Sequence, residues 1–184
     1  QLDPYWAGVW ANRGAAALGL HHTEEALVYI ERALNLDIGL AEAWSNKGTA
    51  FFTLGEFTEA LSCISLALDI NPKLANTWQR KAATLIQLDR FDEALASCDR
   101  ALALAPDSAA AWTDKSTALA GLDRPEEALA CCDRSLAIDP GSGEAWGTRA
   151  VALLALERRE EALACLDRAL EYAPDLANLW SNKA

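Results

Sequence analysis

The chain has 184 residues, 52% of them apolar, and a formal net charge of −11. A chain of this size and apolar content can bury a sizeable core, which excludes intrinsic disorder. Alanine, leucine and tryptophan are prominent among the apolar residues while glycine and proline are few, so we expect an all-α protein. The acidity argues against nucleic acid and anionic membrane surfaces as partners, because both require a concentrated basic footprint.

No apolar run approaches the ~20 residues that a membrane-spanning helix requires, and the N-terminus does not resemble a signal peptide. The five cysteines are an odd number, unlike the dense and even frameworks of small secreted proteins. A reducing compartment is the simpler interpretation, and we expect a cytoplasmic protein. Because the chain begins at Gln1 and contains no methionine, we also expect it to be a fragment of a longer protein.

Tryptophans recur along the chain at a constant interval of 34 residues. With each tryptophan taken as the fourth residue of a unit, complete repeats span 7–40, 41–74, 75–108, 109–142 and 143–176, and partial repeats span 1–6 and 177–184. Six of the seven tryptophans belong to the series, namely Trp10, Trp44, Trp78, Trp112, Trp146 and Trp180. We therefore expect one repeat array over residues 1–184.

Further columns of residues keep the same period. An alanine follows each tryptophan by sixteen residues, another small residue lies seven further on, and four units close with a proline, whereas the first has Ile38. The members are Ala26, Ala60, Ala94, Ala128 and Ala162, then Ala33, Ala67, Ala101, Ser135 and Ala169, then Pro72, Pro106, Pro140 and Pro174. This pattern resembles the tetratricopeptide repeat (TPR) family over essentially the whole chain. The resemblance implies a TPR-type α-solenoid, a right-handed superhelix of antiparallel helix hairpins with a concave groove.

Each repeat predicts two amphipathic helices, independently of the resemblance. In the third repeat, Trp78, Ala82 and Leu85 share one face of the first helix, and Ala94 and Cys98 share one face of the second. We expect the small residues to allow close approach of the helix axes and the tryptophans to fill the space between neighbouring hairpins. The cysteines lie on the second helices, where we interpret them as packing residues.

The turns between the paired helices carry polar and charged residues. His21 and His22 fall in the first turn. In the third and fourth repeats, Asp89 and Asp123 are predicted to cap the second helix, and Pro125 suits a first helical turn.

The side of each first helix opposite the tryptophan is where we expect a ligand to bind, because the resemblance implies that this side lines the groove. It is mostly neutral and polar with apolar spots, which suits the backbone and apolar side chains of a bound peptide. The predicted groove residues are Glu42, Ser45, Asn46, Thr49, Phe52, Asn76, Gln79, Arg80, Ala83, Ile86, Thr113, Thr117, Glu144, Val151 and Leu154. The alternative is that these are solvated positions without a partner.

One TPR subgroup binds acidic C-terminal tails of heat-shock chaperones through a clamp of lysine, arginine and asparagine. The corresponding positions of the first three repeats hold Ala11, Ala15, Asn46, Asn76 and Arg80, of which only Asn46 and Arg80 match. The sequence therefore does not favour a carboxylate-clamp role.

Catalytic and metal-binding patterns are missing from the sequence. There is no HExxH motif and no spaced Cys/His quartet, and no nucleophile is placed near the two histidines. We expect no enzyme activity, no cofactor and no metal site.

The leading interpretation is a scaffold that binds another protein or a peptide through its groove. Two alternatives are a substrate-recruiting TPR arm of a larger enzyme and a self-assembly module. Because a hairpin of this kind cannot bury its apolar face alone, we also expect end-to-end self-association through the terminal faces.

Overall fold

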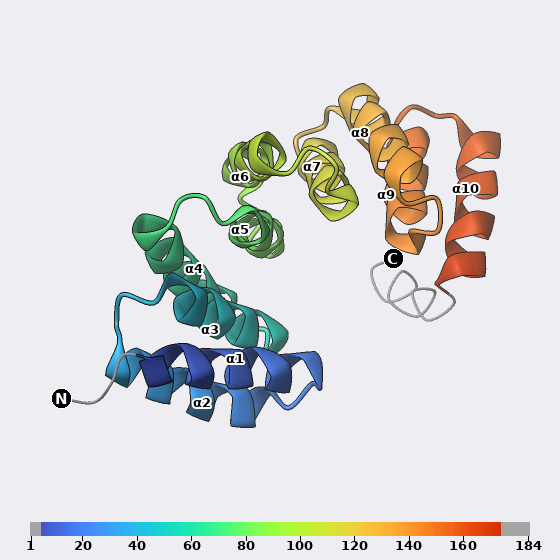
Figure 1. Cartoon of the computed structure of the whole chain (residues 1–184). Helices are drawn as coiled ribbons and strands as arrows, with labels where there is room; N and C mark the ends of the chain where they lie inside the picture. Colours follow the sequence, from blue (N-terminus) through green and yellow to red (C-terminus); the bar gives the residue numbers. More distant parts are fainter. Residues whose placement is uncertain (1–4, 174–184) are drawn as a thin grey trace. The chain divides into compact units, whose positions relative to one another are not determined.

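The protein is described by a computed structural model in which residues 5–173 have a defined backbone. These residues form ten α-helices and no β-strand (Figure 1). The helices are α1 (Tyr5–Gly19), α2 (Thr23–Leu36), α3 (Ala41–Thr53), α4 (Phe57–Ile70), α5 (Ala75–Gln87), α6 (Phe91–Leu104), α7 (Ala109–Gly121), α8 (Pro125–Ile138), α9 (Gly143–Ala155) and α10 (Arg159–Tyr172). The all-α expectation is confirmed. The predicted partial repeat at 177–184 lies outside the described residues.

The helices belong to two compact units, α1 to α5 within Gln1–Leu88 and α6 to α10 within Asp89–Ala184. In the first unit, α1 pairs with α2 and α3 with α4, while α3 packs on α2 and α5 on α4 (Figure 1). In the second unit, α7 pairs with α8 and α9 with α10, while α7 packs on α6 and α9 on α8. The first helices of successive hairpins also touch, α1 with α3, α3 with α5, and α7 with α9. Each unit is therefore a row of first helices backed by second helices.

Small residues lie where the two helices of a hairpin cross, as the sequence predicts. A Cβ atom added to Gly48 on α3 would stand 2.5 Å from Cγ1 of Ile64 on α4, and one added to Gly14 would stand 2.6 Å from Cγ1 of Ile30. The alanines that recur sixteen residues after each tryptophan are all fully buried. Glycine is required at these two crossings because the facing isoleucine occupies the space of a side chain.

The repeated tryptophans among the described residues, from Trp10 to Trp146, are only partly buried, so the expectation that they fill the space between hairpins is met in part. Trp78 packs against the core cluster of Ile64 and Leu68, and Trp112 packs against the cluster of Leu119. The indole Nε1–H of Trp78 donates a hydrogen bond of 2.9 Å to the carbonyl of Pro72, in the preceding inter-repeat turn. Equivalent bonds of 2.8–3.0 Å join Trp44, Trp112 and Trp146 to Ile38, Pro106 and Pro140. Each of these rings therefore also ties its hairpin to the turn before it.

The turns within the hairpins differ from the prediction at the N-caps of α6 and α8. Asp89 and Asp123 have φ angles of 55° and 57°, in the left-handed region, and the N-caps of α6 and α8 are Arg90 and Arg124, which make no side-chain capping bond. The prediction that the two aspartates cap these helices is wrong, because the left-handed residue occupies the turn and the helix begins one residue later. Pro125 does lie in the first turn of α8.

Candidate protein-binding surface

The predicted groove residues of the first unit lie on α3 and α5, and most are half-buried. Glu42 and Asn76, at the start of these helices, are exposed. The half-buried members are Ser45, Asn46, Thr49, Phe52, Gln79, Arg80, Ala83 and Ile86. We refer to these ten residues as the α3/α5 surface.

An aromatic ring and a guanidinium meet on the α3/α5 surface. The Arg80 guanidinium carbon lies 5.2 Å from the centroid of the Phe52 ring, and Phe57 meets the same ring edge-on with centroids 5.4 Å apart. The phenyl ring of Phe52 is thus held between a cation on α5 and a second ring on α4. The arrangement presents a positive charge beside a half-buried aromatic ring, in a protein whose net charge is −11.

Several polar side chains of this surface already make bonds within the protein. The hydroxyls of Ser45 and Thr77 lie 2.8 Å apart and join α3 to α5. The Asn46 amide donates to the carbonyl of Ala11 at 3.5 Å, and the Thr49 hydroxyl donates to the carbonyl of Ser45 at 3.1 Å. These groups keep acceptor capacity for a ligand, but part of their donor capacity is used internally.

The predicted residues of the second unit divide between buried and exposed. Thr113 is only 3% exposed, and its hydroxyl lies 2.8 Å from that of Ser135 on α8, so its side chain is not presented to a partner. Thr117 is half-buried and Glu144 is exposed. Val151 and Leu154 on α9 are 37% and 50% exposed, and they give this unit an apolar spot.

A basic residue stands three positions after each repeated tryptophan from Trp10 to Trp146, and the sequence analysis missed this column. Its members are Arg13, Lys47, Lys81, Lys115 and Arg149, each with its charged group 5.3–5.9 Å from the centroid of that tryptophan ring. Three of them also pair with an acid on the second helix of the preceding hairpin. The pairs are Lys47 with Glu31 at 3.4 Å, Lys115 with Asp99 at 2.6 Å and Arg149 with Asp133 at 3.0 Å. The constant spacing from tryptophan was the signal that could have revealed them.

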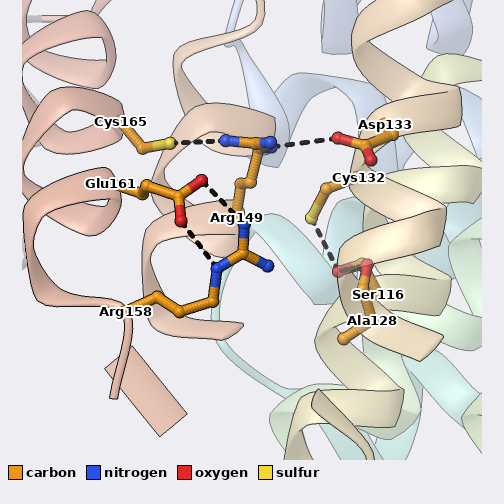
Figure 2. Close-up of polar contacts among 8 residues, drawn as sticks. All are labelled: Ser116, Ala128, Cys132, Asp133, Arg149, Arg158, Glu161 and Cys165. Atoms are coloured by element: carbon orange, nitrogen blue, oxygen red, sulfur yellow. Dashed lines mark hydrogen bonds and ion pairs between the residues drawn. The ribbon is translucent and has the colours of Figure 1, made fainter. Parts of the chain in front are cut away.

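Arg149 is the most connected of these bases (Figure 2). Its Nε donates to Asp133 on α8, and its Nη1 donates to Sγ of Cys165 on α10 at 2.9 Å. Figure 2 also shows Cys132 directed toward Ser116, whose hydroxyl donates to the carbonyl of Ala128 at 2.9 Å and lies 2.8 Å from the sulfur. These contacts join α7 to α8 and α9 to both α8 and α10, and they are structural because they satisfy polar groups within the packed unit.

Three arginines form bidentate ion pairs at the start of second helices in the second unit. Arg124 bonds Glu127 through Nε and Nη2 at 2.7 and 2.9 Å, and Arg158 bonds Glu161 in the same way (Figure 2). The hydrogen bond from Arg124 holds the pKa of the Glu127 carboxyl below its usual value. Arg90 makes the equivalent pair with Glu93. All these groups are exposed, so each pair contributes little to stability.

The five cysteines are buried thiols, as the packing interpretation requires. Burial raises the pKa of Cys132 to about 11 and also raises the pKa of Cys63, Cys98 and Cys131. A thiol with a raised pKa is protonated near neutral pH and is a poor nucleophile or metal ligand. Within residues 5–173 there is also no cluster of His, Cys, Asp and Glu suited to a metal ion. None of the helices formed by these residues has the length and apolar character needed to cross a membrane.

This arrangement, helix hairpins that stack on one another and expose a row of first helices, defines an α-helical repeat protein. Three models of the tetratricopeptide repeat family match the chain, over residues 41–74, 80–143 and 119–184. The chain belongs to the tetratricopeptide repeat family. This fold is typically a scaffold for protein–protein interaction and is generally not catalytic.

Solved structures with the same fold cover nearly all of the chain. YrrB, described as a TPR protein with an unusual peptide-binding site, is 26% identical with a TM-score of 0.72, over 95% of this chain and 91% of its own. MamA from Desulfovibrio magneticus RS-1 is 20% identical with a TM-score of 0.78, over 92% and 96% of the two chains. PilF from Pseudomonas aeruginosa is 20% identical with a TM-score of 0.79, over 90% and 76%. A comparison with curated proteins finds no match.

Proposed function

We propose that the protein is a scaffold that binds a peptide segment of another protein, and that the α3/α5 surface is the main contact in the first unit. The observation that carries this proposal is the Arg80–Phe52 pair, which places a cation over a half-buried aromatic ring at 5.2 Å. A peptide with an apolar side chain beside a carboxylate matches that pair, because the ring offers apolar contact and the guanidinium attracts the acid. The peptide-binding site named for YrrB, which is 26% identical, supports the same class of ligand.

Neighbouring residues extend the proposed contact. Ile86 adds a half-buried apolar side chain on α5, and Asn46 retains its amide oxygen as an acceptor for a peptide N–H. In the second unit, the exposed Val151 and Leu154 form a separate apolar contact, and Thr113 is omitted because it is buried. A peptide bound at either place would lie against the exposed side of the first helices and would leave the packing between the hairpins unchanged.

The test is selection of binders from a random 12-residue peptide library on the wild-type protein, followed by affinity measurement with the variants Phe52→Ala and Arg80→Glu. Each variant is expected to weaken the selected peptides by roughly tenfold or more, as for a central contact of an interface. Lys73→Glu is the matched control, because Lys73 is an exposed base of the same unit that lies in an inter-repeat turn. Selected peptides that bind both variants as tightly as the wild type would contradict the proposal.

Two further roles are proposed, and they differ in the evidence that supports them. A substrate-recruiting arm of a larger enzyme has no specific observation in its favour. Self-association is supported by one observation, the exposure of two leucines on α10. The equivalent leucines of earlier second helices are less exposed. Leu163 and Leu170 are 64% and 46% exposed, whereas the equivalent Leu129 is half-buried and Leu102 is 8% exposed.

A further inference from the structure

A pocket lies at the junction between the first and second hairpins, on the side of α3 that carries Trp44. Its volume is about 260 Å³, just below the range of about 300–1,000 Å³ that is typical of pockets for drug-sized ligands. We name it the junction pocket, and its lining residues are Glu31, Leu34 and Asn35 on α2, Ile38 in the following turn, and Trp44 and Lys47 on α3. All of them belong to the first unit. The volume suits a ligand of the size of one amino acid.

The apolar wall of the junction pocket is formed by Leu34, Ile38 and Trp44. The indole Nε1–H of Trp44 donates to the carbonyl of Ile38 at 2.8 Å, so the ring and the turn are held together as one wall. Leu34 and Trp44 are half-buried, whereas Ile38 is 73% exposed. A ligand that covers Ile38 removes a large apolar side chain from water, and this burial favours binding.

An acid and a base stand beside this wall, one on each of the two helices. The Lys47 ammonium lies 3.4 Å from Oε1 of Glu31, which makes this pair longer than the equivalent pairs of 2.6 Å and 3.0 Å at the junctions of the second unit. An ammonium has three donors and a carboxylate has two acceptor oxygens, so both groups keep hydrogen-bonding capacity for a ligand. The pocket therefore presents one positive and one negative charge side by side.

Asn35 and Ile38 distinguish this junction from the other three that the structure describes. The position of Asn35 is taken elsewhere by Asp69, Ala103 and Ala137, and the position of Ile38 by Pro72, Pro106 and Pro140. Among the described residues, the Asn35 amide has no hydrogen-bond partner, so its donors and its acceptor remain available to a ligand. The first junction thus adds an amide and a long aliphatic side chain to the tryptophan and the charge pair.

We propose that the junction pocket binds a free apolar α-amino acid as its zwitterion. The α-ammonium pairs with Glu31, the α-carboxylate pairs with Lys47 and accepts from the Asn35 amide, and the side chain lies against the apolar wall. An α-amino acid carries both charges on one carbon atom, so it meets the acid and the base together. A ligand with a single charge is attracted by one of the two groups and repelled by the other. This site is independent of the peptide contact at the α3/α5 surface.

The experiment is an NMR titration of the ¹⁵N-labelled full chain with L-phenylalanine up to about 20 mM, a range suited to millimolar affinity. The indole N–H signal of Trp44 and the side-chain amide signal of Asn35 are expected to shift and to reach saturation. N-acetyl-L-phenylalanine lacks the ammonium and L-phenylalaninamide lacks the carboxylate, so each should bind roughly tenfold more weakly, or worse. Glycine, which has no apolar side chain, should not reach saturation in this range.

Variants of the lining residues test the same contacts from the side of the protein. Glu31→Gln and Lys47→Gln should each weaken L-phenylalanine binding by roughly tenfold. Ile38→Pro should weaken it several-fold and leave the fold intact, because three other turns carry proline here and Asp37 already has the extended backbone that a following proline requires. Lys115→Gln is the matched control at the equivalent position of the second unit, and it should bind as the wild type does.

Three results would overturn the proposal. The first is that the signals of Trp44 and Asn35 do not move with L-phenylalanine. The second is that N-acetyl-L-phenylalaninamide, which mimics a residue inside a peptide, binds as tightly as the free amino acid, because the pocket then takes a peptide segment. The third is that Glu31→Gln and Lys47→Gln bind as tightly as Lys115→Gln. Circular dichroism checks that each variant is folded, and the comparison of the four compounds on the wild-type protein needs no variant.

Discussion

The hairpin of α3 and α4 in the first unit and the hairpin of α7 and α8 in the second unit pack the same crossing with different chemistry. In the first, Gly48 leaves room for Ile64, and the contact is wholly apolar. In the second, Ser116 faces Cys132, and the hydroxyl serves both the sulfur and the carbonyl of Ala128. The residues of both crossings are buried.

The difference teaches that the crossing constrains the combined size of the two side chains more than their polarity. Isoleucine on the second helix is matched here by glycine on the first, whereas the smaller thiol leaves room for a hydroxyl that is hydrogen-bonded. Substitutions at the crossings and in the adjoining turns test this interpretation.

Truncation at the apolar crossing has the largest expected effect. Ile64→Ala should cost about 3–5 kcal/mol of unfolding free energy, because Gly48 has no side chain to fill the void. Cys132→Ala at the polar crossing should cost only about 1–2 kcal/mol, since one buried sulfur is lost. Urea denaturation of the two variants measures both values, and equal losses would show that the crossings do not differ in packing.

Overpacking the same crossing should have the next largest effect. Gly48→Ala should lose about 1–2 kcal/mol, because the clash with Ile64 exceeds the gain in helix propensity. The combination of Gly48→Ala with Ile64→Ala should cost less than the sum of the two single losses. Gly8→Ala is the matched control, since a Cβ there meets nothing within 4 Å. A stabilised Gly48→Ala variant would disprove the size constraint.

Removal of the buried hydroxyl tests the polar crossing. Ser116→Ala should cost about 1 kcal/mol, because the hydrogen bonds to Cys132 and Ala128 are lost while the alanine still fits. Ser62→Ala, at an exposed serine on α4, should change stability by less than about 0.5 kcal/mol. Thermal unfolding of both variants measures the difference, and an effect at residue 62 that matches residue 116 would argue against a role for burial.

The smallest effect is expected in the hairpin turns, where glycine occupies the left-handed position in one turn and other residues occupy it elsewhere. Gly55 in the first unit has a φ of 78°, and Glu157 in the second has a φ of 59°. Glu157→Gly should stabilise the protein by about 0.5–1 kcal/mol, because glycine adopts this conformation without strain. Gly55→Ala is the reverse change and should destabilise it. Melting temperatures that shift in the opposite directions would contradict the strain argument.

Much of this fold could be predicted because one set of packing contacts repeats every 34 residues. The buried alanine columns and the pairing of helices follow from that period. The N-caps of these second helices could not be predicted, since a left-handed residue such as Asp123 occupies the turn and moves the N-cap to Arg124.

The candidate surface was less predictable than the fold. Ser45 and Thr113 occupy equivalent repeat positions, yet Ser45 is half-buried and Thr113 is buried. The two hydroxyls have partners on different helices: that of Thr113 lies against Ser135 of α8, which replaces the usual alanine of its column, whereas that of Ser45 lies against Thr77 of α5. Residue spacing defines a helix face, but the exposure of each side chain depends on neighbours that spacing alone does not reveal.

The bond from a tryptophan Nε1–H to the turn before it has a consequence for how such an array diverges. Its acceptor is a backbone carbonyl, supplied by Ile38 in one turn and by Pro72 in the next. Any amino acid offers that carbonyl, so the turn can mutate, and a 34-residue segment can be duplicated beside an unrelated neighbour, without losing the attachment. The tryptophan bond thus depends on the backbone conformation of the turn and not on its side chains, which leaves the turn residues open to evolutionary change.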